Sequence, residues 1–267
     1  MIQLFRAMRR QSAITLAITI LVCPNVYAMQ PLITDDTGTQ GSGGNQIEFS
    51  YNHDRTNTSS ETIWVDTVPL VYTRGLTETL DMFAGLSYSR IRVSSASGNA
   101  SGYGNPSAGV KWRFYEDTDS KTSLAIKPEI LFPVSSAREN AGLGDGKTSG
   151  NLTLILTQEV SFGAINFNAG VGRDRFRNTD EQPDASIKRA SIAPVWEVNE
   201  QWKLALDAGV ESVRAGGDTV RFRFVELGTV YSPHKDLEFA LGVIRTSDNA
   251  NPDSITYSAT AGVTLRF

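Results

Sequence analysis

Cysteine and histidine are scarce in this chain of 267 residues. Cys23 is the only cysteine, and it lies within the first 28 residues, which look like an export signal. Cleavage there would leave a chain with no thiol, no disulfide and no cysteine-based metal site. Only His53 and His234 are available for the acid–base chemistry that most often uses histidine. We therefore predict no cofactor and no metal.

Long apolar runs are also missing beyond residue 28. The first 28 residues combine a basic start with an apolar run at 13–22 and a small-residue site, VYA, at 26–28. This run is about half of the ~20 apolar residues that a spanning helix needs. We predict a signal peptide over residues 1–28, cleaved after Ala28.

Basic residues are fewer than acidic ones, 25 against 29. The predicted signal contains Arg6, Arg9 and Arg10 and no acidic residue, so cleavage leaves a formal charge of −7. A chain of this balance is a poor nucleic-acid binder. We therefore predict no nucleic-acid partner.

Period-two alternation of apolar and polar residues is what the chain has in abundance. At the C-terminus, Ile255, Tyr257, Val263, Leu265 and Phe267 alternate with smaller or polar residues. Such runs predict strands with two unlike faces. We predict twelve, at 46–54, 62–74, 80–92, 103–115, 121–133, 149–162, 165–175, 187–198, 202–213, 221–231, 237–246 and 254–267. Each is long enough for the ~9–11 residues of a tilted strand that crosses a bilayer.

The connections between these segments alternate between short turns and longer polar loops. An even number of strands with this sorting predicts an all-β fold, a transmembrane antiparallel up-and-down β-barrel over residues 46–267. The last strand would pair with the first, leaving no open edge in lipid. The alternation ending in Phe267 resembles the signal by which the barrel assembly machinery recognises outer-membrane proteins. We expect that machinery and outer-membrane lipid as partners, and a Gram-negative outer-membrane location.

Two hairpins test the register. A two-residue turn at Gly163-Ala164 would pair Phe162 with Ile165 and Val160 with Phe167. A three-residue turn at 199–201 would pair Trp196 with Leu204 outside the barrel. Inside, it would pair opposite charges, namely Glu197 with Lys203 and Arg189 with Glu211.

Charged residues of both signs fall on the inward face. They are Glu48, Lys111, Arg113, Lys127, Glu129, Glu159, Arg189, Glu197, Lys203, Asp207, Glu211, Glu226 and Arg266. One interpretation is a hydrogen-bonded network that braces the wall, because buried charges need partners. The other is a narrow polar passage in which charges set selectivity. Our candidates for a transport role are Lys111, Arg113, Lys127, Glu129, Glu159, Asp207 and Glu226.

Residues 29–45 precede the first strand and are too polar and glycine-rich to form one. Asp35 and Asp36 lie among hydroxyl side chains, but no spaced ligand set such as an EF-hand loop is present. We interpret this segment as an N-terminal strap that enters or caps the periplasmic end; the alternative is a flexible lead-in.

Short motifs give a family resemblance. Residues 31–38 (PLITDDTG) resemble the start of mature proteins in the family named for the MetA pathway of phenol degradation. The similarity continues at 102–105 (GYGN), 109–112 (GVKW), 127–129 (KPE) and 132–133 (FP). Two positions depart from the family pattern: Asn105 replaces an expected Asp, and Val134-Ser135 follows Pro133 where Gly is usual. The resemblance implies an outer-membrane transporter for small compounds, aromatic ones included.

Three functions stay open on the sequence. The first is a channel or transporter for an unidentified small molecule. The second is a lipid-acting enzyme, which the geometry disfavours because Ser50 and His53 have opposite parity and face opposite sides of the wall. The third is a structural or adhesive barrel, but its longest loop, 134–148, has no aromatic anchor.

Overall fold

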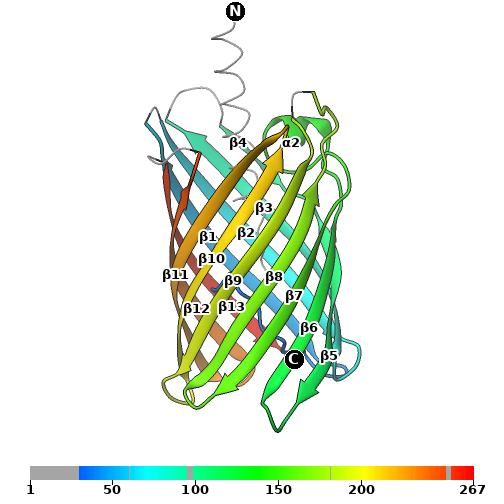
Figure 1. Cartoon of the computed structure of the whole chain (residues 1–267), viewed down its shortest axis with the longest axis vertical. Coiled ribbons are helices and arrows are strands. Elements are labelled where there is room, and N and C mark those ends of the chain that lie inside the picture. Colours follow the sequence, from blue (N-terminus) through cyan, green and yellow to red (C-terminus); the bar gives the residue numbers. More distant parts are fainter. Residues whose placement is uncertain (1–29, 60, 95–98, 181, 251–253) are drawn as a thin grey trace, which may run out of the picture.

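The chain folds into one closed antiparallel β-barrel (Figure 1). The computed structural model describes residues 30–59, 61–94, 99–180, 182–250 and 254–267, so the predicted signal peptide lies outside the described residues. The strands are β1 (Asn45–Asn57), β2 (Thr62–Gly75), β3 (Leu80–Val93), β4 (Ala100–Tyr103), β5 (Ser107–Asp117), β6 (Thr122–Leu131), β7 (Ser149–Val160), β8 (Gly163–Asp174), β9 (Ala185–Glu197), β10 (Trp202–Ala215), β11 (Asp218–His234), β12 (Leu237–Asp248) and β13 (Ile255–Arg266). A short helix, α2 (Ser136–Asn140), lies between β6 and β7. In this part of the chain no helix is long and apolar enough to cross a membrane.

The barrel closes because β1 pairs with both β2 and β13. Phe49 lies opposite Val263 and Ile47 opposite Leu265, so the terminal alternation completes the wall. The prediction of a twelve-stranded barrel is confirmed. The structure has thirteen strands, but β4 and β5 both pair with β3 and together occupy one place in the wall. The single strand predicted at 103–115 is wrong in one respect: it is interrupted at 104–106. Pro106 has no amide hydrogen for the ladder.

The two ends of the barrel differ. The turn end carries the connections at 76–79, 118–121, 161–162, 198–201 and 235–236; the loop end carries those at 58–61, 94–99, 132–148, 175–184, 216–217 and 249–254. One loop-end connection is shorter than predicted, because β10 and β11 extend to a two-residue turn. Gly216 and Gly217 have φ of 58° and 92°, and two positive φ values are what a type I′ turn requires.

The two hairpins behave differently. Trp196 lies opposite Leu204 in β9–β10, the register expected of a turn at 199–201. The register predicted for β7–β8 is wrong: Ser161-Phe162 forms the turn, and Gln158, not Phe162, faces Ile165. Gly163 instead allows β9 to approach closely, because a Cβ at this position would lie 2.3 Å from the carbonyl oxygen of Val195.

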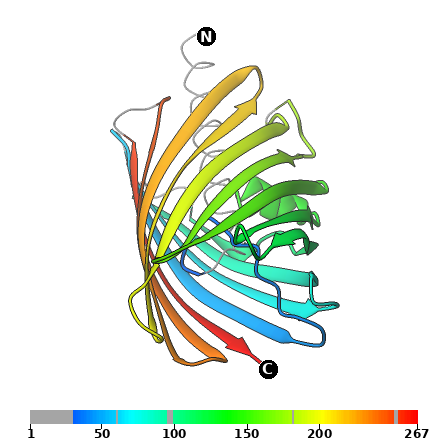
Figure 2. The same ribbon diagram turned by 60° about the horizontal axis from the view of Figure 1, so that its bottom comes forward.

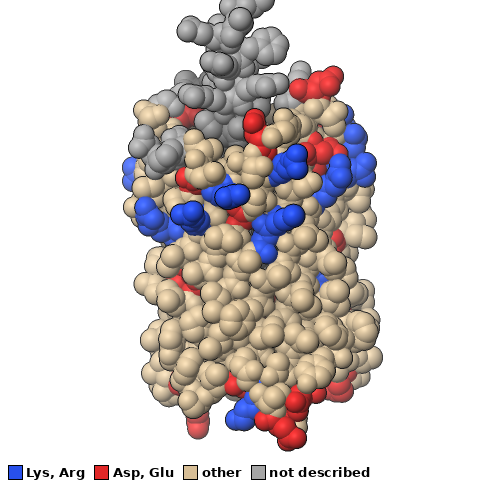
Figure 3. Space-filling model, in the orientation of Figure 1, with Lys and Arg blue, Asp and Glu red and all other residues tan. Residues whose placement is uncertain are grey.

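The outer surface is apolar around the middle of the barrel. Figure 3 shows a wide band almost free of charge, with charged residues gathered at the two ends. Leu227, Leu241 and Val243 are each more than half exposed on this band. Aromatic pairs lie near the turn end, among them Trp202 and Tyr231 with ring centroids 4.6 Å apart. An apolar band with aromatic residues at its border is the lipid-facing surface of a transmembrane barrel.

Candidate lumenal site

Residues 30–44, here called the lumenal segment, run inside the barrel (Figure 2). They contain turns and bends but no helix or strand, so their backbone forms no regular hydrogen-bond ladder. Backbone N–H groups that are withdrawn from water need other partners. Side chains of the barrel wall provide them.

Asp207 on β10 holds the middle of the lumenal segment. Its carboxylate accepts the backbone N–H of Ile33 at 2.9 Å and that of Thr34 at 2.7 Å. The Thr34 hydroxyl donates to the second oxygen of Asp207 at 2.6 Å and lies 2.7 Å from Ser191 Oγ. Asp207 and Thr34 are both fully buried. One carboxylate therefore satisfies several donors of a segment that has no regular structure.

Asp35 makes the second attachment, with two lysines. Its oxygens lie 3.0 Å from Lys111 Nζ and 2.5 Å from Lys127 Nζ, and Lys111 also approaches Asp36 Oδ1 at 3.6 Å. The amide of Asn168 pairs with the backbone N–H and C=O of Asp35, both at 2.8 Å. Three strands, β5, β6 and β8, thus converge on one residue. Removing one partner of a buried ion pair of this kind typically costs ~3–5 kcal/mol.

The lower part of the segment continues the pattern toward the turn end. The backbone N–H of Thr37 donates to Thr157 Oγ1 at 3.0 Å, and the Thr37 hydroxyl lies 2.5 Å from that of Ser123. The backbone N–H of Gln40 donates to both oxygens of Asp81, at 3.0 and 3.1 Å. The segment therefore crosses the lumen with wall contacts along its length.

Three inward glycines make room for the start of the segment. A Cβ on Gly228 or Gly242 would lie 2.9 Å from carbon atoms of the segment, which include Pro31 at both positions. On Gly262 it would lie 1.9 Å from the side-chain oxygen of Gln30. Gly228 and Gly242 are opposite each other in β11 and β12, and Gly262 is on β13. Only glycine permits so close an approach.

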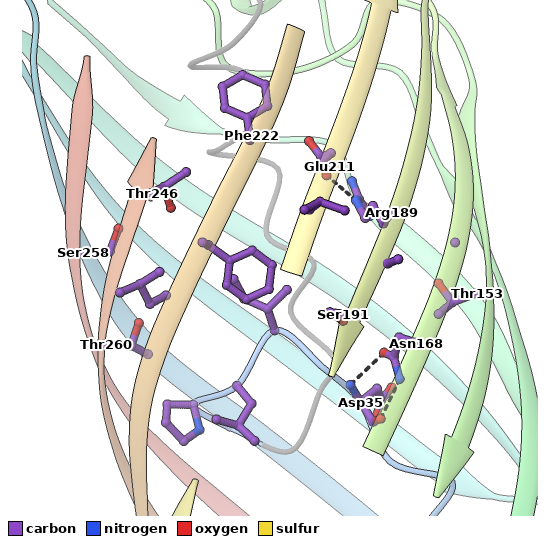
Figure 4. A pocket seen from close by; sticks show the side chains of 18 of the residues that line it. Asp35, Thr153, Asn168, Arg189, Ser191, Glu211, Phe222, Thr246, Ser258 and Thr260 are labelled. Atoms are coloured by element: carbon purple, nitrogen blue, oxygen red, sulfur yellow. Dashed lines mark hydrogen bonds and ion pairs between the residues drawn. The ribbon is translucent and has the colours of Figure 1, made fainter. Parts of the chain in front are cut away.

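A cavity of about 230 Å³ lies between the segment and the loop end (Figure 4). The segment forms part of its lining through Pro31, Leu32 and Ile33. Uncharged polar side chains line it as well: Ser50, Asn52, Asn168, Ser191, Thr246, Ser258 and Thr260. The wall also contributes apolar residues to the lining, among them Phe222, Phe224 and Ile244. The ion pair between Arg189 and Glu211 also borders the cavity. The cavity is therefore amphipathic.

Two loops turn inward at the loop end, 132–148 and 175–184. Leu143 packs against the inward side chains of Ile63, Val65 and Ile91. Phe176 is fully buried in a second apolar cluster, with Ile187, Val213 and Phe222 among its neighbours. Phe222 also lines the cavity, so this cluster connects the second loop to the cavity.

A clasp joins these two loops to each other. Arg177 Nη1 is 2.9 Å from Glu139 Oε2, and the backbone N–H of Arg177 donates to Glu139 Oε1 at 2.7 Å. Arg177 also donates to the carbonyl of Val134 at 2.6 Å. The Glu139 side chain is only 5% exposed, whereas the Arg177 side chain is 39% exposed, so the carboxylate is buried and the arginine reaches the surface.

The remaining transport candidates occupy several places. Glu129 lines the cavity, 3.5 Å from Asn151 Nδ2, and Glu226 is buried opposite Asp207. Arg113 lies near the turn end, where it donates to the carbonyl of Glu78 at 3.1 Å, and Glu159 is exposed at that end.

The expected cross-strand charges lie opposite each other. Arg189 faces Glu211 and forms an ion pair with it. Lys203 faces Glu197, with Nζ and Oε1 3.9 Å apart.

A catalytic or metal site has little support in the described residues. Ser50 is buried and lines the cavity, whereas the imidazole of His53 lies 2.8 Å from Asp66 Oδ1, which also accepts the Tyr51 hydroxyl. His234 is at the turn end, 3.3 Å from Asp236. Over the described ranges, no group of three His, Cys, Asp or Glu side chains is placed to hold a metal.

Comparison with known proteins places the chain in a family. Residues 32–267 match the family described as "Putative MetA-pathway of phenol degradation". The chain belongs to this family. The COG4313 outer membrane channel from Pseudomonas putida F1 is similar in fold, with TM-score 0.69, 14% identity, and 87% of this chain and 98% of that chain covered. The β domain of the Bordetella autotransporter BrkA gives TM-score 0.57 at 13% identity, with 85% and 100% covered. No curated protein matches.

Some of these features leave little trace in the sequence. The glycines at 228, 242 and 262 lie at inward positions of neighbouring strands, and glycine inside a strand is a signal of close backbone approach that the sequence contains. The buried apolar clusters gave no such signal, because alternation alone does not show that Ile63 or Phe222 contacts a loop. The PLITDDTG motif is the clearest sign of the site, since it contains Thr34 and Asp35.

Proposed function

We propose that the protein is an outer-membrane channel for small molecules, in which the lumenal segment narrows the passage and borders a substrate chamber. The turn end then faces the periplasm and the loop end the outside of the cell, the arrangement typical of outer-membrane barrels. The observation that carries this proposal is the set of contacts from Asp207, Lys111 and Lys127 to a segment lying across the lumen. The Pseudomonas putida protein that is similar in fold is itself an outer membrane channel.

The chamber suggests the substrate class. Hydroxyl and amide side chains lie with Phe222 and Phe224 in one lining. Most of its charged side chains are paired within the wall and the segment, Arg189 with Glu211 and Lys127 with Asp35, and the carboxyl groups of Asp54 and Glu129 complete the lining. Ligand sites of this kind combine an apolar surface with a few orienting polar groups. We propose small uncharged molecules with an apolar ring and one or two polar substituents. The family description, which names phenol degradation, supports the same class.

Single-channel recording tests the channel. Mature protein from residue 29 onward is placed in a planar bilayer, together with Asp207→Asn and a deletion of residues 30–44. Asp207→Asn weakens the hold on Ile33 and Thr34, so conductance should rise in this variant and rise further in the deletion. Glu197→Gln is the matched control, since it removes an inward carboxylate at the turn end that does not contact the segment. Equal conductance in all four proteins would exclude a passage governed by this segment.

Current blockade tests the chamber. A neutral hydroxylated aromatic solute, added to the loop-end side, should cause brief interruptions of current in the wild type. Ser258→Trp places a large ring in the chamber and should abolish them while the channel still opens. Interruptions of equal frequency in both proteins, or in neither, would contradict a substrate chamber at this place.

A further inference from the structure

Basic residues form a belt across the outer face near the loop end, part of which Figure 3 shows. It consists of Arg55 on β1, Arg90 and Arg92 on β3, Arg173 on β8, Lys188 on β9, Arg214 on β10, Arg221 and Arg223 on β11, and Arg245 on β12. All except Arg92 are exposed. These side chains point away from the lumen, so the channel proposal does not account for them.

The strand register brings part of the belt together with hydroxyl groups. On the outer face Ser212 lies between Lys188 and Arg221. In the neighbouring row, Ser186 lies between Arg173 and Arg214. Since adjacent strands are ~4.8 Å apart, the two cations of each row are ~10 Å apart with a hydroxyl between them. Guanidinium and ammonium groups with interleaved hydroxyls are donors suited to phosphate oxygens.

Seven of the nine belt cations form no ion pair with a residue that the structure describes, and four of the seven lie on the adjacent strands β9–β11. Arg92 pairs with Asp66 at 2.9 Å, and Arg173 lies 3.6 Å from Asp184. Lys188, Arg214, Arg221 and Arg223 form no ion pair with any described residue. Their charges are available to an external anion.

The apolar band directly below the belt identifies the kind of anion. Arg223 lies opposite Val210, and Arg245 opposite Val225, so each cation borders an exposed valine of the band. A molecule that covers both surfaces has an apolar tail beside a phosphate head. A membrane lipid fits this description, whereas a nucleic acid or free phosphate would use only the belt.

The turn end has the opposite charge. Glu116, Asp119 and Glu200 are exposed there, and Figure 3 shows mostly acidic residues at that rim. A general preference of barrel rims for basic residues would not produce this difference. The belt instead suits a leaflet whose lipids carry more phosphate charge than those at the other end.

We propose that the basic belt over β8–β11 is a binding site for the phosphate groups of a phosphorylated glycolipid of the lipid A type. The acyl chains lie along the apolar band, and the phosphates contact Lys188, Arg214, Arg221 and Arg223. This site is on the outside of the wall and is independent of what passes through the lumen.

Lipid binding to purified, delipidated mature protein tests this proposal. Native mass spectrometry or a fluorescence titration compares diphosphoryl lipid A with its enzymatically dephosphorylated form. Wild-type protein should bind the diphosphoryl form at least about tenfold more tightly, because each basic group near an anionic lipid surface adds to the electrostatic attraction. A variant with Lys188→Gln, Arg214→Gln, Arg221→Gln and Arg223→Gln should lose this preference. The matched control, Lys121→Gln with Lys235→Gln, removes two exposed cations at the turn end and should keep it.

Several results would overturn the proposal. They are equal wild-type affinity for the two lipids, an unchanged preference in the fourfold variant, or competition by inorganic phosphate alone at millimolar concentration. Heat-shifted gel mobility shows whether the variant is folded. If it is not, the comparison of the two lipids on wild-type protein still decides. Failure of the conductance experiments would leave this result unaffected, since the belt does not face the lumen.

Discussion

At the scale of single residues, Asp35 and Asp207 fix a polar, glycine-rich segment inside the barrel. Asp35 does so with ion pairs to Lys111 and Lys127, and Asp207 by accepting donors from Ile33 and Thr34. The sequence suggested either a network bracing the wall or charges tuning a passage. The structure shows a third arrangement for these residues, in which wall charges serve a segment that is not part of the wall. A buried donor left without its partner typically costs ~1–3 kcal/mol, so each anchor matters.

Asn105, where the family resemblance leads one to expect Asp, provides a test at this scale. Its amide donates to the carbonyls of Phe132 at 2.7 Å and Asp145 at 2.9 Å, and its oxygen accepts the N–H of Asp145 at 2.7 Å. Asn105→Asp keeps the acceptor but loses both donors, which should destabilise loop 132–148 by ~1–3 kcal/mol. Hydrogen exchange of peptides covering 132–146 should become faster. Asn178→Asp, an exposed position on the other inward loop, is the control; similar exchange in both variants would contradict this role.

At the scale of elements, the sequence predicted strands better than it predicted what fills the barrel. Period two is a local property, so all twelve wall positions followed from it. The β9–β10 register also followed, because Glu197 and Lys203 lie on the same face across a short turn. The β7–β8 register did not, because Gly163 was assigned to the turn although its close neighbour is Val195 on β9. A rule that uses only neighbouring residues assigns such a glycine to a turn, although its contact with another strand is what requires it.

The inward loops show the same limit. Leu143 and Phe176 are single apolar residues in polar loops, and their partners lie on distant strands. Nothing in the loop sequence indicates that contact. The predicted strap illustrates the intermediate case: its polarity excluded a strand, but only the three-dimensional arrangement shows that Asp35 meets two lysines.

The loop 132–148 also provides a pH prediction. Burial, together with the nearby carboxylates Glu139 and Asp184, raises the pKa of Asp145 from 3.8 to about 6. A raised folded-state pKa means that the folded loop binds a proton that the unfolded one releases, so its stability falls as pH rises from about 4 to about 6. Protection of loop amides, corrected for intrinsic exchange, should be higher at pH 5 than at pH 7. Asp145→Asn should remove this difference, and a difference of equal size in the variant would contradict the assignment.

At the scale of the whole molecule, the barrel separates three environments. The apolar band faces lipid, the basic belt borders it at the loop end, and the lumen contains a segment of the same chain beneath a small amphipathic cavity. Each strand contributes to the lumen with one set of its alternating side chains and to the outer surface with the other. This explains why period two predicted the architecture, and why the contents of the lumen depended on contacts between residues far apart in sequence.

The lipid-facing band gives the last prediction. Leu241 is 60% exposed in the middle of β12, whereas Ser247 is on the same face near the loop end. A cation at the midplane of a bilayer typically costs ~2–4 kcal/mol, but only ~0–1 kcal/mol near the interface. Leu241→Arg should therefore destabilise the barrel in lipid vesicles by ~2–4 kcal/mol in reversible urea unfolding. Ser247→Arg should change its stability little, because it adds one more cation to the belt. Equal losses in the two variants would mean that the membrane boundary does not lie between Leu241 and the basic belt.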